Sequence, residues 1–393
     1  MSKEKKTILI LAKYYLPGYK AGGPIRTIAN FVAKLGGEFN LKLLCLDRDL
    51  GDTSRYLEVK NSTWTQVKNV RIFYLAPELS SFLYIYRILR SEPYEQLYLN
   101  SFFDFKFTFF PLLLRWLRLI PARRVIVAPR GEFSPGALSI KKTKKMFYLN
   151  LVKFLGIYKN VSWQASSEIE ATLISNQFPS VLGKNFPNKI FVAPNIPDET
   201  APNISSLAIN TEDVLGNVKM VFLSRISRMK NLAGALSILK HVNANIDFDI
   251  YGPIEDEEYW SKCQSLIQEL RENVKVRYLG SIQNSEVLDT LKNYDLFFLP
   301  TLGENYGHVI HEALRAGVPV LISDRTPWLN LMKEGVGWSF SLSDEYKFAE
   351  SIEDLSRMSN NSLNQMKIRA QKYGLSVGEI NDAVAKNREI FLQ

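Results

Sequence analysis

Short apolar runs alternate with helix-like segments along most of the chain, and this alternation constrains the fold more than any other feature. The pattern is typical of βαβ units and parallel sheets. In the first half we expect strands at Thr7–Ala12, Leu41–Leu46, Val70–Leu75, Gln96–Leu99, Arg124–Ala128 and Ile190–Ala193. A second series of expected strands comprises Lys219–Leu223, Ile246–Tyr251, Val274–Leu279, Leu296–Pro300 and Pro319–Ser323. The sequence therefore predicts two successive doubly wound α/β units.

Helices are expected between these strands. In the first half they are Pro24–Leu35, Phe105–Leu119, Lys144–Leu155 and Ser167–Gln177. In the second half they are Leu232–Val242, Tyr259–Leu270, Ser285–Asn293 and Gly307–Ala316. In doubly wound folds, ligands bind at the carboxyl ends of the strands.

The chain length of 393 residues also favours two domains. The segment Pro194–Asn217 is rich in proline and in polar residues, which is typical of a linker. We expect an N-terminal Rossmann-like domain over residues 1–200, a linker over 201–217 and a second Rossmann-like domain over 218–376. A final helix over 377–393 is expected to pack back on the first domain.

Composition excludes several classes of protein. Hydrophobic residues make up 46% of the chain and charged residues 23%, which excludes wholesale disorder. Two cysteines and three histidines, without a C-x-x-C pair, give no disulfide framework or His-rich metal site. We therefore expect a cytoplasmic protein and no metal site.

Two apolar segments are candidates for a signal peptide or a membrane-spanning helix, and the sequence argues against both. The N-terminal run Ile8–Ala12 is too short for the apolar region of a signal peptide. The longer segment Phe102–Ile120 contains four charged residues, so we do not expect it to span a membrane.

Charge is distributed unevenly. Residues 1–200 contain 29 Lys and Arg against 15 Asp and Glu, and the remainder contains 20 against 25, so the halves carry +14 and −5. The asymmetry predicts that the first half faces an anionic partner such as a phospholipid surface, a nucleic acid or a phosphorylated substrate. The sequence has no zinc-finger spacing and no aromatic RNA-binding motif, so no nucleic-acid partner is expected.

The densest candidate site lies in the segment Leu299–Trp328, where a strand is followed by a glycine-bearing loop and a helix. Glu304 is expected in the loop and Glu312 in the helix. The N–H groups near the start of that helix would suit an anion. The alternative is an ordinary loop glutamate and a solvated helix glutamate.

A second candidate site lies in the segment Phe222–Asn231, at the end of an expected strand. Arg225 and Lys230 flank the turn there and can neutralise a diphosphate, because arginine offers a fork of donors and lysine a point charge. Arg228 is a third candidate. The alternative is that these cations are solvated surface charges.

Together these two sites resemble the retaining glycosyltransferases of family four. That family has an R-x4-K pair, matched by Arg225 and Lys230, and an E-x7-E pair, matched by Glu304 and Glu312. The resemblance implies the GT-B architecture, in which two facing Rossmann-like domains form an inter-domain cleft. It also implies that the first domain binds the acceptor and the second binds a nucleotide sugar.

The resemblance implies a role for each matched residue. Arg225 and Lys230 would hold the donor diphosphate, Glu304 would contact hydroxyls of the transferred sugar, and Glu312 would contact the ribose. The N–H groups of the loop would complete the phosphate site; they belong to Tyr306, Gly307 and His308. Residues at the ends of two strands would contact the base, and these are Gly252 with Pro253 and Ser281 with Ile282.

In the first half, Gly22 and Gly23 follow the first strand without forming a G-x-G-x-x-G motif, which argues against a dinucleotide-dependent dehydrogenase. In the family this loop approaches the diphosphate from the opposite domain. Nearby, Arg26 is either a further cation or a surface residue.

The segment after a later strand departs from the family pattern. Many relatives have a histidine followed by glycine where this chain has Arg130 and Gly131. Arg130 is therefore a candidate for binding phosphate or acceptor, and Glu132 for binding or deprotonating the acceptor. The three histidines, which are His241, His308 and His311, are expected to be structural or peripheral rather than catalytic.

A lysine-rich and aromatic segment, Ser139–Asn160, matches an interfacial helix on an anionic membrane. The alternative is a helix whose apolar face packs within the domain and whose lysines are solvated.

The combined expectation is a metal-independent retaining glycosyltransferase on the inner face of the cytoplasmic membrane. It would use a UDP- or GDP-linked sugar and a glycan or lipid-linked acceptor, in bacterial surface polysaccharide synthesis. Two alternatives remain: a nucleotide-sugar epimerase or hydrolase, and a non-catalytic nucleotide-binding subunit of an assembly complex.

Overall fold

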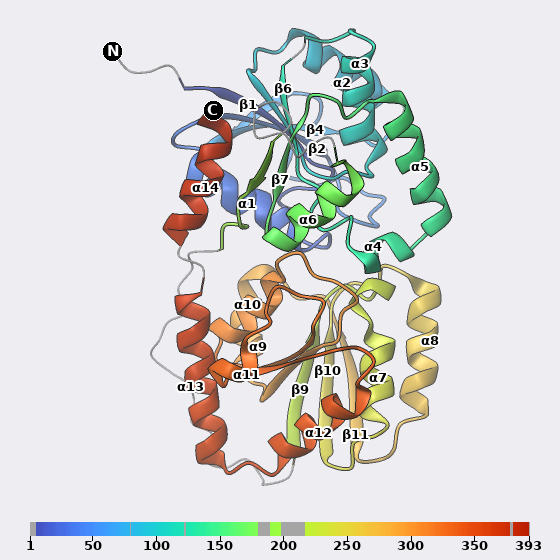
Figure 1. Ribbon diagram of the computed structural model, residues 1–393, viewed down its shortest axis with the longest axis vertical. Helices are drawn as coiled ribbons and strands as arrows, with labels where there is room; N and C mark the ends of the chain where they lie inside the picture. The colour runs from blue at the N-terminus through green and yellow to red at the C-terminus, as the bar shows by residue number, and fades with distance from the viewer. Residues whose placement is uncertain are drawn as a thin grey trace. The chain divides into compact units, whose positions relative to one another are not determined.

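The computed structural model describes residues 5–78, 80–121, 123–179, 189–197, 217–377 and 380–392 (Figure 1). The chain divides into two compact units. Unit 1 comprises Met1–Asp198 and Ile380–Gln393, and unit 2 comprises Glu199–Glu379. Residues 198–216 lie outside the described residues, and they include all of the expected linker 201–217 except Asn217.

Unit 1 is built on an eight-stranded sheet with the order β3-β4-β2-β1-β5-β6-β7-β8. Its strands are β1 Thr7–Leu11, β2 Asn40–Leu46, β3 Trp64–Val67, β4 Val70–Leu75, β5 Gln96–Leu99, β6 Arg124–Val127, β7 Ser162–Ala165 and β8 Ile190–Val192. All neighbours pair in parallel except β3, which is antiparallel to β4. The central strand β1 is buried at every position, as expected for a parallel sheet covered on both faces.

The helices of unit 1 occupy both faces of this sheet. They are α1 Gly23–Leu35, α2 Ser80–Ser91, α3 Phe110–Trp116, α4 Pro135–Ser139, α5 Lys142–Leu155, α6 Glu168–Gln177 and α14 Ile380–Leu392. The expected helix Phe105–Leu119 is instead a π-helical turn, Phe105–Phe109, followed by the shorter α3. Asp104 accepts a hydrogen bond from the Phe107 N–H and so begins that turn.

The last helix, α14, completes the core of unit 1. The Phe391 ring lies 5.3 Å from that of Phe31 in α1 and 5.2 Å from that of Tyr98 in β5. The Asn387 amide accepts from Gln164 at 2.9 Å and donates to the Pro194 carbonyl at 2.7 Å. Both apolar and polar contacts therefore fix this helix against strands that lie far from it in the sequence.

Unit 2 has a six-stranded parallel sheet with the order β11-β10-β9-β12-β13-β14. Its strands are β9 Asn217–Leu223, β10 Asn245–Tyr251, β11 Val274–Gly280, β12 Leu296–Leu299, β13 Val320–Ser323 and β14 Gly337–Phe340. Its helices are α7 Leu232–Leu239, α8 Glu257–Gln268, α9 Val287–Leu291, α10 His308–Arg315, α11 Leu331–Glu334, α12 Glu345–Ser356 and α13 Asn360–Ser376. Short 3₁₀ turns precede α7 and α9, at Arg228–Lys230 and Asn284–Glu286.

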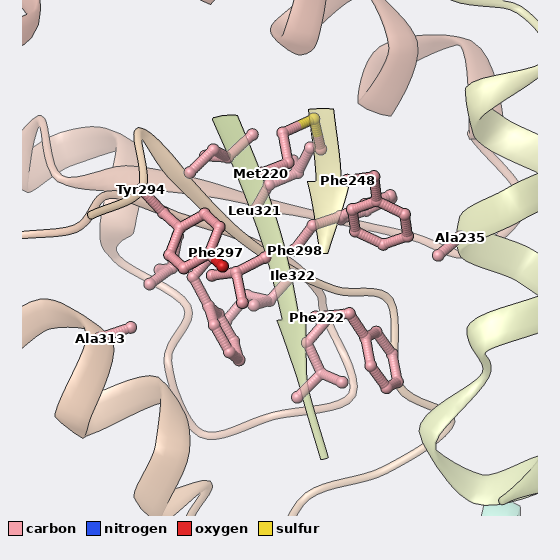
Figure 2. Close-up of a cluster of buried hydrophobic side chains, with 14 of the residues drawn as sticks. Met220, Phe222, Ala235, Phe248, Tyr294, Phe297, Phe298, Ala313, Leu321 and Ile322 are labelled. Carbon is pink, nitrogen blue, oxygen red and sulfur yellow. The ribbon is translucent and has the colours of Figure 1, made fainter. Parts of the chain in front are cut away.

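The core of unit 2 lies on both faces of its sheet. Figure 2 shows Phe222 of β9, Phe248 of β10 and Phe298 of β12 among its buried side chains, and all three are fully buried. Alternate residues of each strand enter opposite faces, so both helix layers are held by continuous apolar contact. Both units therefore have the doubly wound parallel architecture that the apolar runs predict.

The order of the strands locates the switch point of each sheet. In unit 2 the chain runs outward from β9 through β10 to β11, and then resumes at β12 on the other side of β9. The loops after β9 and β12 consequently diverge at one edge, where open α/β sheets bind ligands. In unit 1 the corresponding strands are β1 and β5.

Candidate functional site

The turn after β9 contains the arginine and lysine of the R-x4-K pair. Asn231 ends this turn in a left-handed conformation, with φ of 58°, and its side chain caps α7 by accepting from the Gly234 N–H. The cap fixes the point at which the chain leaves the turn. It thereby holds the preceding Lys230 at the carboxyl edge of the sheet.

Hydrogen bonds join this turn to the loop after β12. The Met229 carbonyl accepts from the Leu302 N–H at 2.8 Å and from the Thr301 hydroxyl at 3.0 Å. In return, the Asn231 amide donates to the Pro300 carbonyl at 2.8 Å. The two candidate segments, 69 or more residues apart in sequence, are thus one structural element.

Lys230 and Glu304 form an ion pair at this junction. Only 14% of the lysine side chain and 11% of the glutamate side chain are exposed. Partial burial strengthens the attraction, because the surroundings screen it less than bulk water does. An arriving anion can take the place of Glu304 beside the Lys230 ammonium, which frees the carboxylate to accept hydrogen bonds from hydroxyl groups.

The two arginines of the turn have different partners. Arg225 forms an ion pair with Glu255 at 2.7 Å, and both side chains are about one-third exposed. Arg228 pairs with Asp256 at 2.9 Å and Glu258 at 3.0 Å, at the beginning of α8. Arg228 is therefore engaged by the acidic start of α8, whereas Lys230 faces the loop after β12.

The loop after β12 ends at the amino terminus of α10. Gly307 is the N-cap, with φ of 78°, a conformation that favours glycine. His308 and Val309 begin the helix, and the first N–H groups of a helix have no partner within it. Glu312 lies one turn further along α10 and is half-buried.

The sequence predicts only a structural or peripheral role for His311, and the structure shows which contacts it makes at the site. Its Nε2 lies 2.8 Å from the Gly374 carbonyl of α13 and its Nδ1 lies 3.2 Å from the Tyr306 hydroxyl. The carbonyl requires a donor, so Nε2 carries the proton and Nδ1 accepts from Tyr306. The Trp328 indole stacks on the imidazole and donates to the Tyr306 carbonyl at 2.6 Å.

These contacts hold Tyr306 at both its hydroxyl and its carbonyl, and so fix the loop that precedes α10. The signal in the sequence is that His311 precedes Leu314 and Arg315 by three and four residues, on the helix face that packs against α13. Burial lowers the pKa of His311 from 6.5 to about 4, which keeps the imidazole neutral at physiological pH.

The expected base-binding residues lie at the adjacent strand ends of unit 2. Gly252 follows β10 with φ of 137°, and a Cβ there would lie 1.9 Å from the Ser224 carbonyl oxygen. The Gly252 N–H donates to the Gly280 carbonyl at 2.8 Å. Ile282 is half-buried beyond β11 and packs on the core, whereas Ser281 is exposed.

The glycine loop of unit 1 is held by Asp49, which follows β2. The Asp49 carboxylate accepts from the N–H groups of Tyr19 at 2.6 Å and Lys20 at 2.9 Å. Gly22 then adopts φ of 71° and caps α1, in which Gly23 is the first residue. The role of this loop at a diphosphate stays a prediction.

Arg130 and Glu132 both follow β6, but their side chains have different surroundings. The Glu132 carboxylate accepts from the Ser101 hydroxyl at 2.8 Å and from the Phe102 and Phe103 N–H groups, at 2.5 and 3.0 Å. Burial raises the pKa of Glu132. The structure thus gives this carboxylate a role in holding the loop after β5, while its expected action on an acceptor remains untested. Arg130 is half-buried and hydrogen-bonded to Asn100, Asn195 and Tyr98.

Within the described ranges, no group of three or more His, Cys, Asp or Glu side chains is placed to hold a metal ion. His241, the remaining histidine, is exposed and its ring lies 5.1 Å from that of Tyr346.

Protonation of His311 is predicted to destabilise the protein. Between about pH 4 and 6.5 the unfolded chain binds a proton at this residue and the folded chain does not, so stability falls as pH decreases through that interval. The largest slope for one group is about 1.4 kcal/mol per pH unit. Urea unfolding at pH 5, 6 and 7 should show a smaller slope in His311→Gln than in the wild type. The exposed His241→Gln is the control, and a wild-type slope in His311→Gln would contradict the assignment.

Replacement of Gly252 is predicted to displace the ends of β9 and β10. Gly252→Ala would bring a methyl group into the Ser224 backbone, next to Arg225, and we expect a loss of more than 2 kcal/mol of unfolding free energy. Gly280→Ala is the matched control, because Gly280 also has a positive φ of 76° but has open space around its Cβ position. Equal losses in the two variants would indicate backbone strain alone.

Comparisons with known proteins identify the family of this site. Residues 178–373 match the family model of the group 1 glycosyltransferases. Over 144 residues the chain is 25% identical to the phosphatidyl-myo-inositol mannosyltransferase of Mycobacterium leprae; the match covers 35% of this chain and 37% of that protein.

Among solved structures, sucrose-phosphate synthase from Thermosynechococcus elongatus has a TM-score of 0.70 at 13% identity, over 99% of each chain. Anabaena HepE, in complex with UDP and glucose, has a TM-score of 0.66 at 15% identity, over 98% of each chain. These similarities extend over both units and share their fold, which is GT-B. The sequence match, the two parallel sheets and the paired motifs at the switch point of unit 2 agree: the chain carries a group 1 glycosyltransferase domain within a GT-B fold.

Proposed function

We propose that the chain is a retaining glycosyltransferase that moves a sugar from a UDP- or GDP-linked donor to a glycan or lipid-linked acceptor. The observation that carries this proposal is the junction of Lys230 and Glu304 at the switch point of unit 2. It combines a cation for phosphate with a carboxylate for hydroxyl groups, which is the pair of functions that a nucleotide sugar requires. The donor class is further supported by the UDP bound to the structural neighbour HepE.

The proposed chemistry depends on stabilising the leaving group. Cleavage of the anomeric C–O bond leaves negative charge on the diphosphate and positive charge on the sugar. Arg225 and Lys230 would stabilise the diphosphate, together with the amino terminus of α10. The acceptor hydroxyl would attack from the same face, form the new C–O bond and give its proton to the leaving phosphate oxygen.

Glu304 and Glu312 would bind hydroxyl groups in this scheme, and Tyr306 would keep the α10 terminus in position through His311 and Trp328. The proposal needs no metal ion, because the protein cations and the helix terminus act on the diphosphate themselves. Gly252 and Ile282 would adjoin the base.

An exposed apolar face of α5 supports a membrane partner. Phe147, Leu151 and Phe154 lie at i, i+4 and i+7, on one face of the helix. Phe147 is 70% exposed and Phe154 is 88% exposed. Large apolar side chains at such exposure are typical of an interaction surface.

Basic residues flank this apolar face. Lys141, Lys142 and Lys144 are exposed, whereas Lys145 is half-buried and donates to the Ala137 carbonyl at 2.6 Å. Burial also lowers the pKa of Lys145. This lysine therefore does not belong to the exposed basic group formed by Lys141, Lys142 and Lys144. Each basic residue near an anionic bilayer contributes about 1 kcal/mol to the attraction of the protein to that bilayer.

These features favour a peripheral enzyme at the inner face of the cytoplasmic membrane. No described helix has the length and hydropathy of a membrane-spanning segment. The matched relative is a mannosyltransferase named for a phosphoinositide lipid, which is consistent with a lipid-linked acceptor. Bacterial surface polysaccharide synthesis is the process that we propose for such an acceptor.

Binding of a nucleoside diphosphate tests the donor site. We expect UDP or GDP to raise the melting temperature in the presence of EDTA, and Lys230→Ala to abolish that rise. Arg225→Ala or Lys230→Ala should also lower kcat/KM by the equivalent of about 2.7–4 kcal/mol, the scale found for removal of one oxyanion donor. Thermal shift and donor turnover measure the two effects.

Lys240→Ala provides the matched control, since Lys240 also pairs with a glutamate but lies at the end of α7. A thermal shift that survives Lys230→Ala, or vanishes with EDTA, would contradict the diphosphate assignment or the metal-free chemistry. Donor turnover at full rate without an acceptor would instead favour the epimerase or hydrolase. Nucleotide binding without any turnover by the wild type, across a panel of acceptors, would favour the non-catalytic subunit.

Membrane binding is predicted to depend on both parts of the α5 surface. The triple variant Lys141→Gln, Lys142→Gln and Lys144→Gln should lose binding to anionic liposomes, most strongly at low salt. The double variant Phe147→Ser and Phe154→Ser should lose the part of liposome binding that persists at high salt, because that part depends on apolar contact. Co-sedimentation at 50 and 300 mM NaCl measures both.

The control for α5 is Lys292→Gln, a lysine on the surface of unit 2 that pairs with Asp289. Unchanged sedimentation of both α5 variants would contradict the membrane proposal and favour the structural interpretation of this helix.

A further inference from the structure

Arg130 occupies a position that is costly for any residue with a side chain. Its φ is 55°, and the following Gly131 has φ of 81°. The left-handed conformation costs an L-residue roughly 1–2 kcal/mol that glycine does not lose. The local backbone therefore does not favour a residue with a long side chain at this position, and the contacts of the guanidinium decide what the residue does.

The side chain is fixed by three acceptor residues from the ends of two strands. Nη2 donates to Asn100 Oδ1 at 2.7 Å and to the Tyr98 hydroxyl at 2.6 Å, and Nη1 donates to Asn195 Oδ1 at 2.9 Å. Asn100 follows β5 and Asn195 follows β8, while Arg130 itself follows β6. The guanidinium therefore spans the carboxyl edge of the sheet in unit 1, beside its switch point.

All three partners are neutral. In the part of the chain that the structure describes, no carboxylate forms an ion pair with Arg130. The nearby Glu170 carboxylate instead accepts from the N–H groups of Gly131 at 2.6 Å and Ser166 at 2.8 Å. A half-buried cation without a counter-charge is unfavourable unless an anion joins it.

We propose that Arg130 binds a phosphate group of the acceptor substrate. This inference rests on the proposed glycosyl transfer, in which unit 2 already supplies Arg225 and Lys230 for the donor diphosphate. Nε also donates to Asn100 Oδ1 at 3.3 Å, so the hydrogen bonds to Asn100, Asn195 and Tyr98 leave one Nη1 donor for the ligand. The positive charge remains uncompensated. The phosphate belongs to a soluble sugar phosphate or to a lipid-linked sugar diphosphate, which share the same recognising chemistry.

One substitution separates anion binding from a structural role. Asn100→Asp keeps an oxygen acceptor 2.7 Å from Nη2 and gives Arg130 a carboxylate partner. A purely structural arginine would be held more firmly by this change. An anion-binding arginine would be neutralised, because the new carboxylate occupies its charge and repels phosphate.

The experiment measures two ligand classes by calorimetry, with UDP or GDP at saturating concentration in the donor site. The probes are glucose 6-phosphate against glucose, and a prenyl diphosphate sugar against the prenyl alcohol in detergent. We expect the wild type to prefer the phosphorylated member of at least one pair, and the preferred pair identifies the source. Asn100→Asp and Arg130→Gln should each reduce that affinity tenfold or more, with the melting temperature of Asn100→Asp unchanged or raised. Asn69→Asp, which adds the same charge on an exposed turn of unit 1, should leave the affinity unchanged.

Three results would overturn the assignment of Arg130. They are a wild type without preference for phosphate, an Asn100→Asp variant with wild-type affinity, and a parallel loss of nucleotide affinity in Arg130→Gln. Nucleotide binding by the wild type is recorded separately in the same titrations. Its absence would contradict the proposed donor site and not the assignment of Arg130.

Discussion

The adjacency of β9 and β12 is the constraint on which the rest of unit 2 depends. Parallel pairing of these strands brings two loops to one edge, although their sequences are separated by β10, β11 and the intervening helices. The Met229 carbonyl then joins the loops, and Lys230 meets Glu304. Without that pairing the two charged motifs would be unrelated surface residues. The chemistry of the site is thus a consequence of sheet topology as much as of the residues themselves.

Much of this arrangement could be predicted from the sequence, because buried parallel strands appear as continuous apolar runs. Strand β3 was not expected: its pattern is only half-buried, and it pairs antiparallel at the edge of its sheet. The helices α12 and α13 were also not expected, since their polar residues conceal the narrow buried faces of amphipathic helices. Two further strands were not expected. They are β7, which is fully buried but carries the polar residues Ser162 and Gln164, and the edge strand β14. Periodicity therefore identified strands with continuous apolar runs and missed those interrupted by polar residues.

The candidate site was predictable in its residue types and less so in its contacts. Motif spacing indicated Lys230 and Glu304, but their ion pair depends on strand order, which spacing does not contain. The sequence also placed Lys145 within the lysine-rich segment Ser139–Asn160 and gave Glu132 a role toward an acceptor. Burial gives both residues contacts that the sequence does not indicate, since Lys145 donates to the Ala137 carbonyl and Glu132 holds the loop after β5. The role of Glu132 toward an acceptor stays a prediction. Such differences arise from tertiary packing and are invisible in a local pattern.

The return of α14 to unit 1 has a consequence for the order in which the chain acquires its structure. During synthesis all of unit 2 leaves the ribosome before Phe391, whose ring lies against Phe31 and Tyr98. Until α14 has been synthesised, the sheet of unit 1 therefore lacks one of its covering helices, and the apolar surface beside α1 stays exposed. Exposed apolar surface of this kind promotes aggregation in incomplete chains. The unit that is translated first is in this way the last to be completed.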